Sequence, residues 1–296
     1  MEVPFNRGVD AGHRHCREPG GGGAVVVDRS ERPIGMFDSG VGGLTVARAH
    51  IDLLPHEHLI YFGDTAHCPY GPRPLEEVRK FALEITDALV EEDVKMLVVA
   101  CNSAASAALD EMRERYVVPI VSVIEPAVKS AIAISRNRRI GLIGTEATVN
   151  SGAYEHAVGD TKANVLLIAQ ACPRFVEFVE RGDTSSDELL EVAREYLEPM
   201  KESEVDTLIL GCTHYPLLRG VLRYVMGDDV VLVSSAEETA NQVYAELRDA
   251  DLLNRSPQTG THRFIASSEQ GISGELGARF LGPEFKAVEY RPWDKP

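Results

Sequence analysis

The segment Leu97-Val98-Val99-Ala100-Cys101-Asn102-Ser103 decides the fold, because Leu208-Ile209-Leu210-Gly211-Cys212-Thr213-His214 repeats its pattern 111 residues later. A second pair of segments, Ile34-Gly35-Met36-Phe37-Asp38-Ser39 and Ile140-Gly141-Leu142-Ile143-Gly144-Thr145, is separated by 106 residues. One such match between buried strands is weak and can arise by coincidence. Two matches in nearly the same register predict two similar halves within one chain.

Short apolar runs alternate with longer amphipathic stretches over most of the chain, which is typical of parallel sheets covered by helices on both faces. Apolar residues recur with a helical period in Leu75–Glu92, Asp187–Met200 and Ala236–Leu247. The predicted strands are Ile34–Phe37, His58–Phe62, Met96–Ala100, Ile120–Val123, Arg139–Ile143, Val165–Ala169, Thr207–Leu210, Val230–Val233 and a weaker one at His262–Ala266.

The predicted fold class is therefore α/β, with two pseudosymmetric parallel-sheet domains and the active site in the cleft between them. Ligands of open α/β sheets lie beyond the carboxyl ends of the strands, which favours that position. Residues 1–32 contain four consecutive glycines and little periodicity, and we expect them to form a disordered N-terminal extension. Residues 33–126 together with 236–296 are predicted to form the first domain, and residues 127–235 the second.

The composition is that of an ordinary globular protein, with 296 residues, 44% of them hydrophobic and 26% charged. A formal net charge of −16 argues against direct nucleic-acid binding through arrays of Lys and Arg, but it leaves a small anionic substrate open. No run of 18 apolar residues and no signal-peptide core are present, so we expect no membrane partner and a cytoplasmic location. The five cysteines include no C-x-x-C pair and predict neither a disulfide framework nor a metal site.

Cys101 and Cys212 each follow a predicted buried strand and precede a predicted helix. Asn102 and Ser103 are good N-caps for the first helix, and Thr213 followed by Pro216 predicts a capped start of the second with proline in its first turn. The exposed N–H groups and positive dipole at a helix N-terminus lower the pKa of a cysteine from about 8.5 to roughly 3.5–7.5. The alternative is that each cysteine only fills a strand end as a small apolar residue. Their matching positions in the two halves favour a chemical role for both.

A pair of thiols that approaches one pocket from two sides suits few reactions. A nucleophilic hydrolase needs one thiol and a base, and a redox dithiol would hold its sulfurs within bonding distance. Two thiols separated by a substrate can remove a proton from one face of a carbon atom and return one to the other face, which inverts its configuration. One must be a thiolate while the other is a thiol, so both must be poised near the working pH.

Each cysteine also needs a group that exchanges protons with it. His214 lies two residues after Cys212, and Asp38 ends the first predicted strand in the same crevice as Cys101. Both residues have ordinary alternatives, a structural histidine and a helix cap.

The glycine-rich turn Gly40-Val41-Gly42-Gly43 lacks the Lys-Ser/Thr of a phosphate-binding loop. We interpret its glycines as allowing backbone N–H groups to approach a carboxylate closely. Cys68 is interpreted as incidental and Cys172 as structural, since neither follows a strand and precedes a helix start.

Several longer motifs together resemble those of bacterial glutamate racemases. They are Asp38–Val46, Gly63-Asp64-Thr65 with Pro69-Tyr70-Gly71, Ala100–Ala104 and Gly211–Leu218, and Val233–Ala240 resembles the actinobacterial members. The resemblance runs from about Ile34 to Leu281. It implies the two-domain pseudosymmetric fold and reversible conversion of L-glutamate to D-glutamate for peptidoglycan precursor synthesis, with no pyridoxal phosphate, other cofactor or metal. It also implies a homodimer.

The same resemblance assigns site residues by motif. It implies that Cys101 is the base for D-glutamate and Cys212 the base for L-glutamate. The implied assisting groups are Asp38 and His214, with Glu180 as a further acid near His214. The implied substrate-binding residues are Asp38, Ser39, Tyr70, Gly71, Asn102, Ser103, Thr213 and His214. The family often has Thr where this chain has Ser103, and the hydroxyl is retained.

Three alternative functions remain open on the sequence. A sister racemase could act on aspartate, because the cysteine pair does not select the side chain. A non-catalytic amino-acid-binding protein could share the fold. A cysteine hydrolase would release ammonia from an amide substrate.

Overall fold

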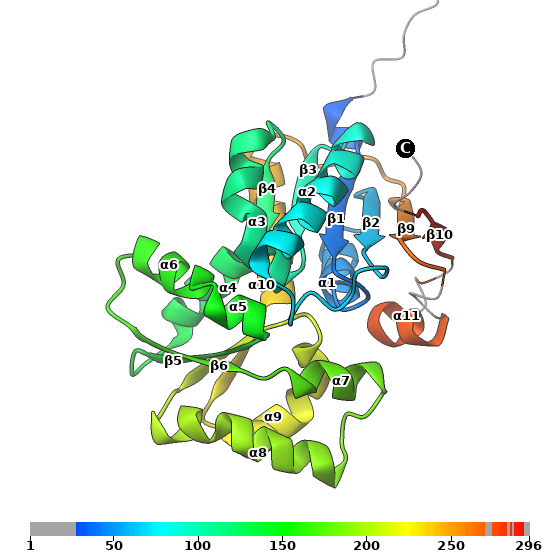
Figure 1. Cartoon of the computed structure of the whole chain (residues 1–296). Helices are drawn as coiled ribbons and strands as arrows, with labels where there is room; N and C mark the ends of the chain where they lie inside the picture. The colour runs from blue at the N-terminus through cyan, green and yellow to red at the C-terminus, as the bar shows by residue number, and fades with distance from the viewer. Residues whose placement is uncertain (1–27, 270–273, 283–284, 286, 293–296) are drawn as a thin grey trace, which may run out of the picture.

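Two parallel sheets, each flanked by helices, lie one above the other in this protein (Figure 1). The computed structural model describes residues 28–269, 274–282, 285 and 287–292. Most of the predicted extension, residues 1–27, lies outside the described residues. Arg29–Glu31 form a short 3-10 helix, η1, and the buried Lys95 ammonium donates a hydrogen bond to the carbonyl of Ser30.

The upper sheet in Figure 1 has six strands, and its central strands are completely buried because their residues are apolar on both faces. Helices α2 and α3 cover the near face, while α1 and α10 pack on each other behind the sheet. The strands, in spatial order, are β10 (Glu289–Tyr290), β9 (His262–Ala266), β2 (Leu59–Gly63), β1 (Ile34–Asp38), β3 (Met96–Val99) and β4 (Ile120–Ser122). The helices are α1 (Leu44–Leu53), α2 (Leu75–Glu91), α3 (Asn102–Arg115), α10 (Ser235–Asp249) and α11 (Gly274–Leu281). Helix α4 (Ile124–Ile134) follows β4 and packs against strands of the second sheet and against α10.

The lower sheet has four parallel strands, and its edge strand β6 is more exposed than the others. In spatial order the strands are β6 (Leu166–Ala171), β5 (Arg139–Gly144), β7 (Thr207–Gly211) and β8 (Val231–Ser234). The helices are α5 (Glu146–Asn150), α6 (Ala153–Asp160), α7 (Arg174–Glu180), α8 (Asp187–Glu202), the 3-10 helix η2 (Tyr215–Leu218) and α9 (Arg219–Met226).

The two halves repeat the same strand order. The order β2-β1-β3-β4 in the first sheet corresponds to β6-β5-β7-β8 in the second. The repeated segments found in the sequence are the equivalent pairs β1 with β5 and β3 with β7. The predicted pseudosymmetric α/β fold is therefore confirmed. All nine predicted strands are present, with ends that differ by at most two residues, and the two-residue strand β10 was not predicted.

Elements from the end of the chain return to the first half. Strands β9 and β10 extend the first sheet, and α10 packs between α1 and α4. Helix α11 packs against α1, where Arg48 Nη1 donates to the carbonyl of Leu281 at 3.1 Å. We propose domain boundaries near residues 126 and 235, with 33–126 and 236–296 in one domain and 127–235 in the other.

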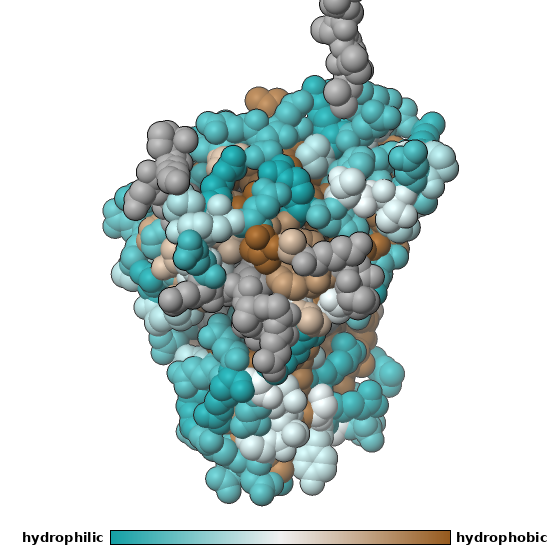
Figure 2. Space-filling view, turned by 90° about the vertical axis from the view of Figure 1, so that its right-hand side faces the viewer, coloured by the Kyte–Doolittle hydropathy of each residue, from teal (hydrophilic) through white to brown (hydrophobic). Residues whose placement is uncertain are grey.

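The surface on the α11 side is mainly hydrophilic, and its apolar residues gather around the middle of the view (Figure 2). Among the described residues, no helix combines the length and apolar character needed to cross a membrane.

Candidate active site

A cavity of about 180 Å³ opens between the two halves, where the carboxyl ends of β1 and β3 meet those of β5 and β7. Its lining includes every site residue predicted from the sequence except the fully buried Asp38. The lining residues are Ser39, Cys68, Pro69, Tyr70, Gly71, Pro72, Cys101, Asn102, Ser103, Thr145, Glu146, Pro173, Val176, Glu177, Glu180, Cys212, Thr213 and His214.

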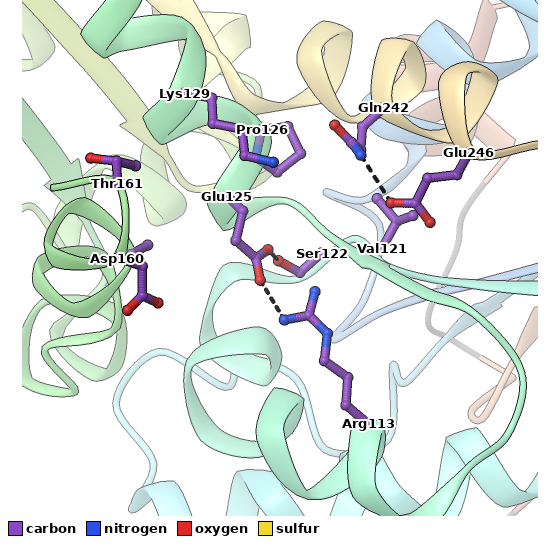
Figure 3. A pocket seen from close by; sticks show the side chains of 11 residues that line it. Arg113, Val121, Ser122, Glu125, Pro126, Lys129, Asp160, Thr161, Gln242 and Glu246 are labelled. Atoms are coloured by element: carbon purple, nitrogen blue, oxygen red, sulfur yellow. Dashed lines mark hydrogen bonds and ion pairs between the residues drawn. The ribbon is translucent and has the colours of Figure 1, made fainter. Parts of the chain in front are cut away.

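A second cavity of about 370 Å³ offers a contrast (Figure 3). Its lining, among the described residues, contains neither cysteine nor histidine. Two of its charged groups pair with each other, since Arg113 Nη1 lies 2.6 Å from Glu125 Oε1. The two cysteines that follow equivalent strands, and His214, therefore line the cavity between the strand ends and not this one.

Cys101 follows β3 and is itself the N-cap of α3, with its sulfur accepting a hydrogen bond from Ala104 N at 3.5 Å. The expectation that Asn102 or Ser103 caps this helix is therefore wrong. Burial and the nearby charge of Asp38 raise the pKa of the Cys101 thiol to about 12, despite hydrogen bonds from Ala104 and Ser39. The predicted lowering of this pKa is also wrong, because desolvation outweighs the helix N-terminus.

Cys212 directly follows β7, at the position equivalent to Cys101 in the other half. The residues after it begin the 3-10 helix η2 rather than an α-helix, and His214 is its N-cap without a side-chain hydrogen bond. The predicted helix start capped by Thr213 is therefore wrong, although Pro216 does lie in the first turn. Both cysteines are buried and free, so their sulfurs are not bonded to each other.

His214 lies between Cys212 and Glu180. Its Nδ1 is 3.9 Å from the Cys212 sulfur, and its Nε2 is 3.3 Å from Glu180 Oε1 in a contact not aligned as a hydrogen bond. Burial alone would lower the pKa of His214, but Cys212, Glu180 and the charge of Asp38 raise it to about 10. The imidazole is therefore protonated at neutral pH.

Asp38 is fully buried at the end of β1, and its carboxyl group joins the two halves. Its Oδ1 accepts a hydrogen bond from Gly40 N at 2.9 Å, and its Oδ2 accepts one from Thr213 Oγ1 at 3.4 Å. Burial raises its pKa above the ordinary value, against the opposing effects of His214 and these hydrogen bonds. The sequence predicts that N–H groups of the glycine-rich turn approach a carboxylate. In the structure, the N–H of Gly40 in this turn donates to the carboxylate of Asp38.

Asn102 and Ser103 enter the cavity from the first turn of α3 and contact residues of the second half. Ser103 Oγ lies 2.9 Å from Thr145 Oγ1, and Asn102 Oδ1 accepts a hydrogen bond from Tyr154 Oη at 2.7 Å. Thr145 was missed as a cavity residue, although the internal repeat already matched it with Ser39. Tyr154 carried no signal in the sequence, because it lies 52 residues from Asn102.

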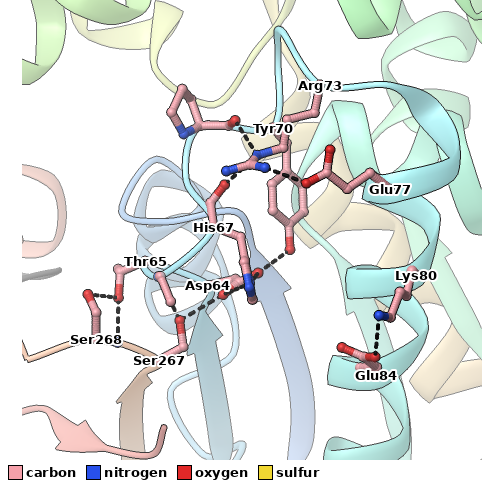
Figure 4. Close-up of polar contacts among 12 residues, drawn as sticks. Asp64, Thr65, His67, Tyr70, Arg73, Glu77, Lys80, Glu84, Ser267 and Ser268 are labelled. Atoms are coloured by element: carbon pink, nitrogen blue, oxygen red, sulfur yellow. Dashed lines mark hydrogen bonds and ion pairs between the residues drawn. The ribbon is translucent and has the colours of Figure 1, made fainter. Parts of the chain in front are cut away.

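The cavity wall formed by Tyr70 and Gly71 is held by a buried carboxylate (Figure 4). Asp64 accepts hydrogen bonds from Tyr70 Oη at 2.6 Å, Ser267 Oγ at 2.7 Å and His67 Nδ1 at 2.9 Å. Because the Tyr70 hydroxyl is engaged by Asp64, Tyr70 offers its ring and backbone to the cavity. Cys68, interpreted as incidental, lines the same wall.

The arrangement of the described side chains does not indicate a metal site. Among the described residues, no group of three or more His, Cys, Asp or Glu side chains is arranged to hold a metal ion.

Comparison with known proteins supplies the family. Residues 44–243 match the model of the Asp/Glu/Hydantoin racemase family. A glutamate racemase from Parafrankia sp. is 55% identical over 269 residues, which cover 90% of this chain and 97% of the relative. This chain belongs to the glutamate racemases. It is therefore an isomerase that acts on glutamate, which removes the binding-protein and hydrolase alternatives.

Solved glutamate racemases share the fold. A glutamate racemase isoform from Bacillus anthracis is 37% identical, with a TM-score of 0.83 and coverage of 90% of this chain and 98% of that one. A Francisella tularensis glutamate racemase, solved in complex with D-glutamate, is 32% identical with the same TM-score and coverage of 90% and 99%.

Proposed function

We propose that this racemase interconverts L- and D-glutamate by a two-base mechanism in which Cys101 and Cys212 act on opposite faces of the α-carbon. One observation carries the proposal: two free, buried cysteines occupy equivalent positions in pseudosymmetric halves and line one cavity. This arrangement supplies a proton acceptor and a proton donor without a cofactor.

The charge states of Cys101 and His214 favour one assignment of acid and base to the two cysteines when L-glutamate is the substrate. The raised pKa of Cys101 keeps it a thiol at neutral pH, and we assign the role of base toward L-glutamate to Cys212, whose sulfur lies 3.9 Å from Nδ1 of the His214 imidazolium. From L-glutamate, the Cys212 thiolate takes the α-proton and the Cys101 thiol delivers its own proton to the other face. The product is D-glutamate, with the proton now on Cys212 and the negative charge on Cys101.

The reverse reaction begins from that second state. Cys101 then removes the α-proton of D-glutamate, and Cys212 returns a proton to form L-glutamate. Asp38 has a raised pKa and lies near Cys101, so we assign it the transfer of protons to and from that thiol. His214 and Glu180 are assigned the same task for Cys212.

The carbanion formed between the two steps needs electrostatic stabilisation, because the α-proton of an amino acid is only weakly acidic. We assign substrate binding to Asp38, Ser39, Tyr70, Gly71, Asn102, Ser103, Thr213 and His214. Asn102 supports this assignment, since it lines the cavity and its buried Nδ2 has no hydrogen-bond partner among the described residues. A substrate carboxylate can accept that hydrogen bond.

We also propose that the D-glutamate formed here supplies peptidoglycan synthesis. The homodimer, the cytoplasmic location and the absence of nucleic-acid binding stay predictions from the sequence.

The first test is turnover of L-glutamate in deuterated water without added pyridoxal phosphate. We expect D-glutamate that carries deuterium at the α-carbon, because the second thiol exchanges its proton with solvent. Cys101→Ala and Cys212→Ala should each lower racemisation by at least about 10²–10⁴-fold. Cys172→Ala is the matched control, because Cys172 is free and buried but does not line the cavity.

Three outcomes would contradict the proposal. Near-normal racemisation by either alanine variant would refute the two-base assignment. Absence of α-deuteration by the unaltered protein would refute the chemistry. Equal turnover of aspartate would refute the preference for glutamate.

A further inference from the structure

The side-chain amide of Asn102 is fixed at one end and free at the other. Its Oδ1 accepts the hydrogen bond from Tyr154 Oη at 2.7 Å, while its Nδ2 is buried without a partner among the described residues. Asn102 borders the cavity at the first residue of α3. A buried donor left unpaired is costly unless a ligand satisfies it.

We propose that Tyr154 is a positioning residue, whose hydroxyl orients the Asn102 amide so that its NH₂ group points to a carboxylate of the substrate. The inference rests on the proposed function, because it requires an anionic amino acid in this cavity.

Without the hydroxyl, the two orientations of an amide differ little, because its oxygen and nitrogen ends have nearly the same shape. A flipped amide would present Oδ1 to the substrate carboxylate, and two acceptors would then face each other. A flipped amide could donate its NH₂ group to the phenol oxygen, but the phenol proton would then lack an acceptor, because Asn102 Oδ1 is the acceptor it has among the described residues. The Tyr154 hydroxyl therefore favours the orientation in which the amide oxygen faces away from the ligand.

Tyr154 is suited to donate rather than to exchange protons. It is fully buried, and burial together with the charge of Cys212 raises its pKa far above the working range, so that the phenol stays neutral. Its hydroxyl also lies beside the chain at Gly211, where an added Cβ would be 3.4 Å away.

The hydrogen bond also crosses between the two halves. Tyr154 belongs to α6 of the second half, and Asn102 begins α3 of the first. The orientation of the Asn102 amide therefore depends on the contact between the two halves.

A double-mutant cycle tests the inference. Tyr154→Phe keeps the ring and removes only the hydroxyl, and we expect KM for both enantiomers to rise roughly tenfold with a much smaller change in kcat. Asn102→Ala should raise KM by at least as much. In the Asn102→Ala background, Tyr154→Phe should not raise KM further, because the amide that the Tyr154 hydroxyl orients is no longer present.

Tyr215→Phe is the matched control, since Tyr215 is equally buried and its hydroxyl donates to the carbonyls of Gly144 and Cys172. It should lose comparable stability without a change in KM. A merely structural defect in Tyr154→Phe would lower the active fraction, and hence kcat, at constant KM. That result, or a further tenfold loss in the Asn102→Ala background, would overturn the inference.

Asn102→Asp gives a test that leaves Tyr154 in place. The new carboxylate still accepts from Tyr154 but turns an oxygen toward the substrate, so its KM should exceed that of Asn102→Ala, and a lower value would overturn the inference. If the unaltered protein fails to exchange the α-proton with solvent, the proposed function is at fault. If it racemises glutamate and Tyr154→Phe keeps its KM, only the role of Tyr154 is wrong.

Discussion

The protonation of His214 results from opposing effects, of which those that raise its pKa prevail. Burial disfavours the imidazolium, while Cys212, Glu180 and Asp38 favour it. Cys212 and Asp38 are buried, whereas the Glu180 side chain is 38% exposed. Glu180 is thus the partner of His214 that can be altered with the least disturbance to the two thiols.

We predict that Glu180→Gln lowers the pKa of His214 below its value of about 10, because the contact with Glu180 raises it. The imidazolium would then lose its proton at a lower pH, and the alkaline limit of L-glutamate turnover should move to lower pH. The measurement is the pH profile of kcat for L-glutamate. Glu177→Gln, on the same helix and the same cavity wall, is the control and should leave the profile in place.

Sequence reasoning predicted Cys101, Cys212, Asp38 and His214 as one site, but it gave the wrong sign for the shift in the pKa of Cys101. The helix N-terminus was visible in the sequence, and the depth of burial was not. The pKa of Cys101 depends on burial in the folded protein and on Asp38 and Ser39, which lie far from it in the sequence.

At the scale of elements, the loop that carries Tyr70 and Gly71 is fastened by a single buried carboxylate, Asp64 (Figure 4). We predict that Tyr70→Phe costs about 1–3 kcal/mol of unfolding free energy, since one hydrogen bond to a buried acceptor is lost. It should also raise KM for both enantiomers, because the loop borders the substrate cavity. Thermal unfolding and steady-state kinetics measure the two effects.

The control for this loop is Tyr116→Phe. The Tyr116 hydroxyl donates to Asp87 Oδ1 at 2.7 Å, but Asp87 is solvent-accessible and remote from the cavity lining. Water can replace the lost bond there, so the stability loss should be smaller and KM unchanged. Equal losses in both variants would show that burial of Asp64 does not matter.

Local patterns predicted the strands well, since buried parallel strands are short apolar runs whatever packs on them. They failed where a contact with a distant segment decides the outcome. Cys101 replaces Asn102 as a helix cap, η2 replaces an α-helix after Cys212, and β10 pairs with β9 over only two residues. Thr145 could have been predicted as a cavity residue, because the internal repeat aligns it with Ser39. Tyr154 lies outside the repeated segments and could not have been predicted in this way.

For the whole molecule, the repeat explains why one cavity holds two similar sets of groups. Equivalent strand ends from the two halves face each other, and a few close contacts fix their separation. Thr45 Oγ1 donates to the carbonyl of Thr213 at 3.2 Å, and Gly42 lies against Thr213 and His214. Since the two thiols belong to different halves, this separation also determines whether both can reach one carbon atom.

Gly42→Ala tests that dependence. An added Cβ would lie 2.3 Å from Thr213 Oγ1 and 2.5 Å from His214 Nδ1, so the halves or the His214 side chain must move. We predict a stability loss of about 1–3 kcal/mol and a larger proportional loss of kcat/KM than of folded protein. The control is Gly220→Ala in the first turn of α9, where, beyond the adjacent backbone, no atom of the described residues lies within 4 Å of the added Cβ, so activity should be unchanged and stability should not fall. Full activity in folded Gly42→Ala would mean that the spacing of the halves tolerates such a shift, and that the two thiols do not require this contact to act on one carbon.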